Sequence, residues 1–232
     1  MKTTKKDENV ENINEELEYT IKKGCDTFMN GFLYSMVRST ISHAMNYGNE
    51  EENEKGFTVK SFLTESVCTG IEFASFDFTN GVCDSIFKPN LNTFTKWVPW
   101  TIGTSSLSAI ISKSIQYPLM CSATNQKMTS KGYKEEIKMA IPHSIGFNLT
   151  RLYADMVLPP KEKIGGKYIR STLCITAGNF GSAMLSLPSL MPYYPIKSIA
   201  LGFLPIIPLC FIENAIFSSV KSLTKPIRLL PK

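Results

Sequence analysis

The chain alternates between long stretches rich in apolar residues and short polar connectors. Six such stretches stand out, and each is long enough for a helix of several turns. They are residues 27–47, 57–87, 97–123, 137–158, 171–191 and 198–220. Clusters of Gly, Pro and charged residues separate most of them, as is typical of turns between helices. The pattern predicts an all-α fold of about six helices.

Stretches of this length fit the span of a bilayer, which requires about 20 residues. Residues 171–196 carry no charged side chain, and stretches 101–112 and 176–186 are rich in Gly, Ala, Ser and Thr. Such small residues let helices approach closely within lipid. We therefore expect a polytopic membrane bundle over residues 25–225. The alternative is a soluble helical bundle, because several of the stretches contain charges.

The two ends of the chain differ in charge from the body. Residues 1–60 carry a net charge of −3, whereas residues 61–232 carry +8. We expect residues 1–24 to be a disordered acidic tail that binds a protein partner, with a short helix over 13–23 as an alternative. The basic tail, 226–232, suits an anionic membrane surface, and no nucleic-acid partner is expected because interleaved aromatic residues are lacking.

The lysines and arginines also predict a topology. With six spans, the side that holds both termini would carry 15 of them outside the helices, and the opposite side 7. Because positive residues accumulate on the cytosolic side, we expect both termini there. The lipid bilayer is then the first expected partner of the chain.

The stretches group into three helical hairpins, at about 27–87, 97–158 and 168–221. Phe73, Phe147 and Phe211 recur at matching places in the second helix of each hairpin. A proline follows each of these helices, at Pro89, Pro159 and Pro226. The spacing indicates a repeat of about 65–75 residues, slightly beyond the usual range of tandem units.

Three hairpins with fragments of a Pro-x-acid-x-x-base motif resemble the mitochondrial carrier family. The fragment "PLMCSA" keeps Pro118, and "PYYPIK" keeps Pro192 and Lys197. The resemblance implies helix kinks at Pro118 and Pro192. It also implies a multi-pass protein of a mitochondrial membrane, or of a related organelle, that moves a small anionic solute; another intracellular membrane is the alternative.

The sequence departs from the carrier motif at its acids and bases. Met120 and Tyr194 stand where the family has an acid, and Ala123 stands where it has a base. A gate without these ion pairs favours a second interpretation, in which the protein is a non-transporting scaffold, receptor or assembly and import component.

Charged residues inside the predicted spans are the candidate cavity-lining or substrate-binding residues, because charges within a membrane are costly and usually functional. They are Arg38, Glu72, Asp77, Lys113, Arg151 and Glu213. Lys113 lies in the middle of stretch 97–123. We expect it to pair with Glu72, Asp77 or Glu213, or to contact an anion. Arg151 and Asp155 lie four residues apart and are expected to pair with each other.

Catalysis and metal binding are not expected. The chain has two histidines, and its six cysteines are widely spaced, without the short Cys–x–x–Cys spacing of zinc sites. We expect reduced thiols, no catalytic residue, no metal site, no cofactor and therefore no enzyme.

Overall fold

The computed structural model describes residues 5–45, 58–87, 89–91, 93–160, 162–163, 166–191, 211–212 and 214–216 of the 232-residue chain. Five long helices carry the fold: α1 (Lys5–Met45), α3 (Val59–Phe87), α4 (Phe94–Ala123), α5 (Ser130–Val157) and α6 (Lys167–Leu190). A short helical piece lies within 211–216. The described residues contain no strand, so the prediction of an all-α bundle is confirmed.

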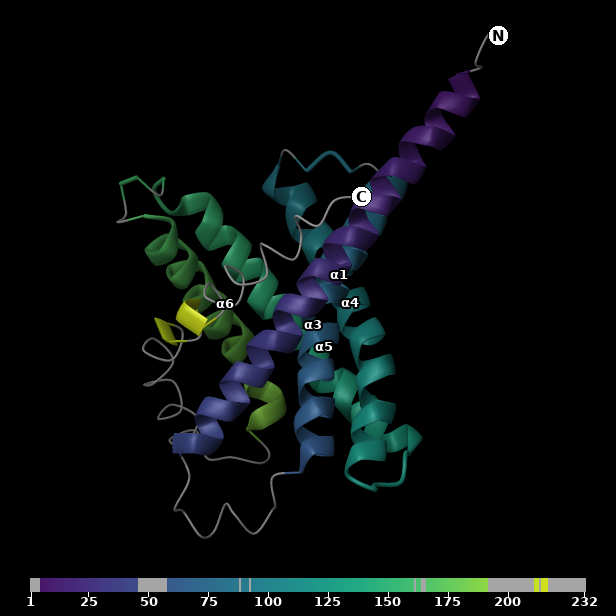
Figure 1. Ribbon diagram of the computed structural model, residues 1–232. Coiled ribbons are helices and arrows are strands. Elements are labelled where there is room, and N and C mark those ends of the chain that lie inside the picture. Colours follow the sequence, from purple (N-terminus) through teal and green to yellow (C-terminus); the bar gives the residue numbers. More distant parts are fainter. Residues whose placement is uncertain are drawn as a thin grey trace, which may run out of the picture.

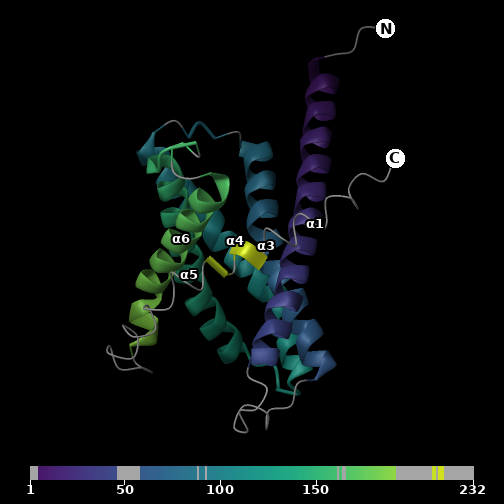
Figure 2. The same ribbon diagram turned by 60° about the vertical axis from the view of Figure 1, so that its left-hand side comes forward.

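The helices pack in the order of the sequence. Extensive contacts join α1 to α3, α3 to α4, α4 to α5 and α5 to α6 (Figures 1 and 2). Helices α1 and α3 run antiparallel, because Gly24 faces Phe78 whereas Gly31 faces Phe73. Helices α5 and α6 do so as well, because Gly146 faces Gly181 whereas Asp155 pairs with Arg170. The α5–α6 contact links the second predicted hairpin to the third, so the described helices form one continuous series.

The prediction that residues 1–24 are disordered is wrong for the described part. One helix, α1, continues through residues 5–24 into the first apolar stretch. Thr20 is buried where its side chain packs over Gly81 of α3, and Lys23 lies 3.4 Å from Asp77. Composition suggested disorder because the segment has few apolar residues, but contacts with α3 hold its second half in place.

The start of α5 also differs from the sequence pattern. Helix α5 begins at Ser130, before the expected start at residue 137, because the Thr129 side chain accepts a hydrogen bond from Gly132 N at 3.1 Å and caps the helix. Helix α4 runs through Pro118 and ends at Ala123. Pro192, the second predicted kink, lies outside the described residues.

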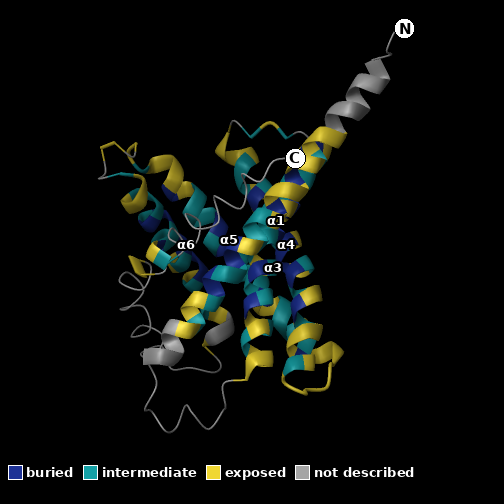
Figure 3. Cartoon of the chain, viewed as in Figure 1, coloured by how far each residue is buried: buried dark blue, intermediate teal, exposed yellow. Residues whose placement is uncertain are grey.

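Small and polar residues occupy the interior of the bundle. Among the described residues, no Leu, Ile, Val, Met, Phe or Trp is buried; the buried side chains belong to Ser, Thr, Asn, Gln, Ala, Cys and one Tyr. Figure 3 shows this buried zone where the helices meet, with exposed residues on their outer faces. Soluble proteins have the opposite distribution, since Leu, Ile, Val, Phe and Met fill their cores.

Helix α4 shows the reversal most clearly. Its inward face is lined with small or polar residues: Thr101, Thr104, Ser105, Ser108, Ala109, Ser112 and Gln116. Its outward face exposes Ile102, Leu107 and Ile110. Helix α6 repeats the arrangement, with Gly181 and Ser182 inside and with Phe180, Met184 and Leu185 outside.

Glycines let α5 and α6 touch backbone to backbone. A Cβ atom added at Gly146 would lie 2.3 Å from the carbonyl oxygen of Gly181, and one added at Gly181 would lie 2.6 Å from that of Gly146. Real side chains do not come so close, so these two positions require glycine. The approach is of the kind that small residues permit between helices in lipid.

In the part of the chain that the structure describes, no helix is both long enough and apolar enough to cross a membrane.

We predict that Gly146→Ala destabilises the bundle by about 1–3 kcal/mol, the usual cost of overpacking a tight interface. Gly103→Ala is the matched control, since a Cβ there would meet nothing within 4 Å. It should stabilise the fold by up to about 1 kcal/mol through helix propensity alone. Thermal unfolding followed by circular dichroism measures both, and equal effects of the two substitutions would contradict the close α5–α6 packing.

Candidate functional site

Lys113, the charge in the middle of α4, is held by an acid that the sequence pattern did not suggest. Its Nζ lies 3.4 Å from Glu136 Oε2 on α5, and its side chain is 27% exposed. Of the expected partners, Glu72 and Asp77 do not make this ion pair, and Glu213 lies outside the described residues. Glu136 was assigned to a connector, but the early start of α5 brings it beside α4. The signal that could have found it is the capping residue Thr129 ahead of good helix formers.

Around Lys113 the structure gathers groups from three more helices. Glu72 of α3 and Lys113 both lie close enough to His143 of α5 to act on its ring electrostatically. The His143 Nδ1 atom in turn forms a hydrogen bond with Ser182 Oγ of α6 at 2.5 Å. Two of the predicted site residues, Glu72 and Lys113, therefore lie in one electrostatic neighbourhood.

Asp77 belongs to a different interface. Its carboxylate pairs with Lys23 at 3.4 Å and accepts a hydrogen bond from Thr27 Oγ1 at 2.9 Å, so both partners come from α1. This arrangement uses Asp77 to join α1 to α3. Arg38 lies on the exposed surface of α1, and Glu213 lies outside the described residues.

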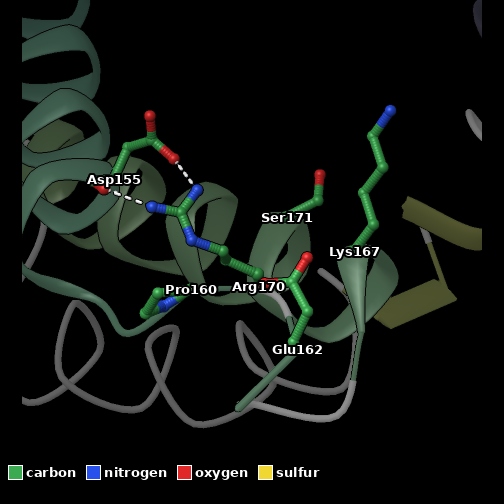
Figure 4. Close-up of a pocket in the computed structure, with 6 residues that line it drawn as sticks. All are labelled: Asp155, Pro160, Glu162, Lys167, Arg170 and Ser171. Carbon is green, nitrogen blue, oxygen red and sulfur yellow. Dashed lines mark hydrogen bonds and ion pairs between the residues drawn. The ribbon is translucent and has the colours of Figure 1, made fainter.

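The expected pair between Arg151 and Asp155 is not the ion pair that forms. Asp155 is instead paired with Arg170 of α6. The same guanidinium donates to the main-chain oxygen of Asp155 (Figure 4) and, at 3.1 Å, to that of Pro159. Arg170 thus joins the end of α5 to the start of α6. Sequence spacing favoured the pair within α5, but the fork of Arg170 reaches three oxygens of one turn.

Arg151 lies against α6 instead. Its Cβ atom is 3.2 Å from the position that a Cβ at Gly178 would take, and its Nε atom is buried without a hydrogen-bond partner. Gly178 therefore makes room for the arginine stem.

A shallow recess of about 500 Å³ opens beside Arg170. Its lining, drawn in Figure 4, consists of Asp155, Pro160, Glu162, Lys167, Arg170 and Ser171. Charges of both signs line it, and each of the three nitrogens of the Arg170 guanidinium already donates to the end of α5. The recess offers no pairing of a nucleophile with a base.

Hydrogen bonds between side chains join the inward faces of the helices. Asn148 of α5 donates to Ser105 Oγ of α4 at 3.2 Å, and Ser144 donates to the Ser105 main-chain oxygen at 3.2 Å. Asn214, in the short helical piece, donates to Thr172 Oγ1 of α6 at 2.6 Å. Such contacts stabilise helix association where no apolar core does so.

Among the residues that the structure describes, no group of three His, Cys, Asp or Glu side chains could hold a metal ion. The cysteines at 25, 68, 83, 121 and 174 are free thiols. Of the predicted site residues, Asp77, Lys113 and Arg151 each contact a neighbouring helix.

The chain matches no protein-family model, and no curated protein or solved structure is significantly similar to it.

We predict that exchanging the charges of the Lys113–Glu136 pair preserves stability. Either single change, Lys113→Glu or Glu136→Lys, should cost about 1 kcal/mol by placing like charges side by side, because the pair is partly exposed. The double variant should recover most of that loss. Chemical unfolding of the four proteins provides the measurement. A double variant that is as unstable as the sum of the singles would show that the two residues are not coupled.

Proposed function

We propose that the protein is a membrane-embedded helical scaffold that does not transport solutes. One observation carries the proposal: the described interior is built from small and polar side chains, while large apolar side chains such as Ile102, Leu107 and Phe180 lie exposed on the outer faces of the helices. Lipid favours this distribution, because apolar side chains gain nothing by leaving lipid, whereas polar groups gain by meeting one another.

The distribution of charge supports a scaffold rather than an anion carrier. A carrier requires cationic groups that converge on one ligand. Here Lys113 is engaged with Glu136 between α4 and α5, whereas Arg151 lies against Gly178 of α6. Each of these cations serves a helix interface of its own.

The first half of α1 supplies a surface for a protein partner. Glu15, Glu18 and Tyr19 are exposed and lie on one side of the helix, while Thr20 and Gly24 on the other side are buried against α3. An acidic face with one aromatic residue suits a basic partner. A mitochondrial membrane, or that of a related organelle, is the proposed location, on the strength of the carrier resemblance alone.

Membrane embedding predicts that the outward face of α4 touches acyl chains. A single tryptophan placed there by Leu107→Trp, with Trp97→Phe and Trp100→Phe, should be quenched in proteoliposomes by phosphatidylcholine brominated on its acyl chains. The control is Lys163→Trp in the same background, because Lys163 lies in the connector between α5 and α6. If Leu107→Trp is quenched no more than the control, the alternative of a soluble bundle replaces the proposal.

The scaffold role predicts no uptake of inorganic phosphate, a dicarboxylate or ATP into proteoliposomes, and no change with Lys113→Ala. Uptake that Lys113→Ala abolishes would identify a carrier instead.

Binding of a partner through α1 should be lost in Glu15→Lys/Glu18→Lys and kept in the control Glu65→Lys, on the exposed surface of α3. Removing residues 1–24 is not a clean test, since Thr20 and Lys23 contact α3.

A further inference from the structure

One face of α5 carries lysines over its first turns. Lys131, Lys134 and Lys138 are exposed and follow one another at spacings of three and four residues, so they form a single stripe. Lys127 is exposed in the turn that precedes the helix. Only Lys138 among them has an ion pair in the described part of the chain, with Glu135 at 3.7 Å.

The same face becomes apolar immediately after Lys138. The spacing of three and four residues continues through Ile141, Ile145, Leu149, Leu152 and Met156. The first four are partly exposed, and Met156 is 62% exposed. The inward side of α5 is occupied by its contacts with α4 and α6, through residues such as Asn148 and Gly146. The stripe and the apolar row are therefore two sections of one outward face.

The surface next to the stripe is apolar as well. Helix α4 runs beside this part of α5, since Ser114 forms a hydrogen bond with Tyr133 Oη at 2.6 Å. There α4 exposes Ile115, Leu119 and Met120. Lysines set among apolar groups can lay their stems on the apolar surface and raise their ammonium groups into a polar layer.

We propose that the stripe formed by Lys131, Lys134 and Lys138 binds the headgroups of anionic phospholipids, and that the bilayer boundary crosses α5 between Lys138 and Ile141. This inference rests on the proposed membrane embedding and adds the lipid class and the depth of the helix. The apolar row after Ile141 meets acyl chains, while the three ammonium groups meet phosphates. Lysines near an anionic bilayer surface gain free energy in this way.

A tryptophan next to the stripe can report which lipid gathers there. Met139→Trp, in the background Trp97→Phe and Trp100→Phe, places the only tryptophan one residue after Lys138, at a position that is 39% exposed. Proteoliposomes then contain equal fractions of phosphatidylcholine and phosphatidylglycerol, with bromine near the headgroup end of the acyl chains of one lipid or the other. The ratio of the two quenching constants gives the local preference for the anionic lipid.

We expect a preference of roughly five-fold for phosphatidylglycerol, the factor that one lysine near an anionic surface contributes. It should fall towards one at high salt and in Lys131→Gln/Lys134→Gln/Lys138→Gln. The matched control, Lys22→Gln/Lys96→Gln/Lys167→Gln, removes the same charge from exposed sites at the other end of the bundle and should keep the preference. Circular dichroism confirms that both triple variants remain helical.

The other outcomes separate the two proposals. Equal quenching by both lipids would leave membrane embedding standing and overturn the lipid site. A preference that both triple variants abolish equally would assign it to net charge and also overturn the site. Absence of quenching by either lipid would overturn the depth assigned to α5 and, together with an unquenched Leu107→Trp, the membrane proposal itself. Lysines that are shielded from both lipids would instead be free to meet an acidic protein.

Discussion

The structure depends on close approach between neighbouring helices, which requires glycine or another small residue where they touch. Gly146 and Gly181 meet backbone to backbone, Gly70 accommodates Phe28, and Gly81 accommodates Thr20. The fully buried residues are small, so the apolar side chains that contribute are half-buried ones such as Phe28, Phe73 and Phe147, each packed against a glycine. Dispersion between closely packed helices and hydrogen bonds between them add to the stability. A methyl group added at such a contact would push the two helices apart. Substitutions are therefore tolerated better on the outer faces of the helices than at their contacts.

Small faces allow close approach but do not fix how far one helix slides along the next. Directional polar contacts do so here, and each interface has its own. Lys23 and Asp77 join α1 to α3, Lys113 and Glu136 join α4 to α5, and Arg170 joins α6 to α5. Between α3 and α4 the Gln116 amide donates to the Cys68 main-chain oxygen at 2.8 Å, and the Trp100 indole donates to Asp84 at 3.1 Å.

The sequence predicted the class of the fold and the helix faces lined with small residues. It placed Lys113, Asp77 and Asp155 on helices but did not identify their ion-pair partners. The runs of Ser, Thr and Gly in α4 and α6 are local patterns, so they could be recognised without a structure. The partner of Lys113 could not, because Glu136 comes beside it only through the early start of α5. Asp155 likewise had a good partner four residues away, and only the turn between α5 and α6 brings Arg170 closer. A helix over residues 13–23 was the alternative to disorder that the sequence offered, and contacts of Thr20 and Lys23 with α3, which composition does not encode, accompany the helical state.

The use of charge for alignment bears directly on function. Taking a charge out of water is expensive, and its cost is offset either by a ligand or by a counter-charge on another helix. Lys113 and Asp77 have such counter-charges, and each of them joins two neighbouring helices. Sliding one of these helices along its neighbour would break the ion pair, at a cost of about 1 kcal/mol because the pairs are partly exposed. These charges therefore align neighbouring helices, and the outer faces remain as the surfaces on which other molecules can act.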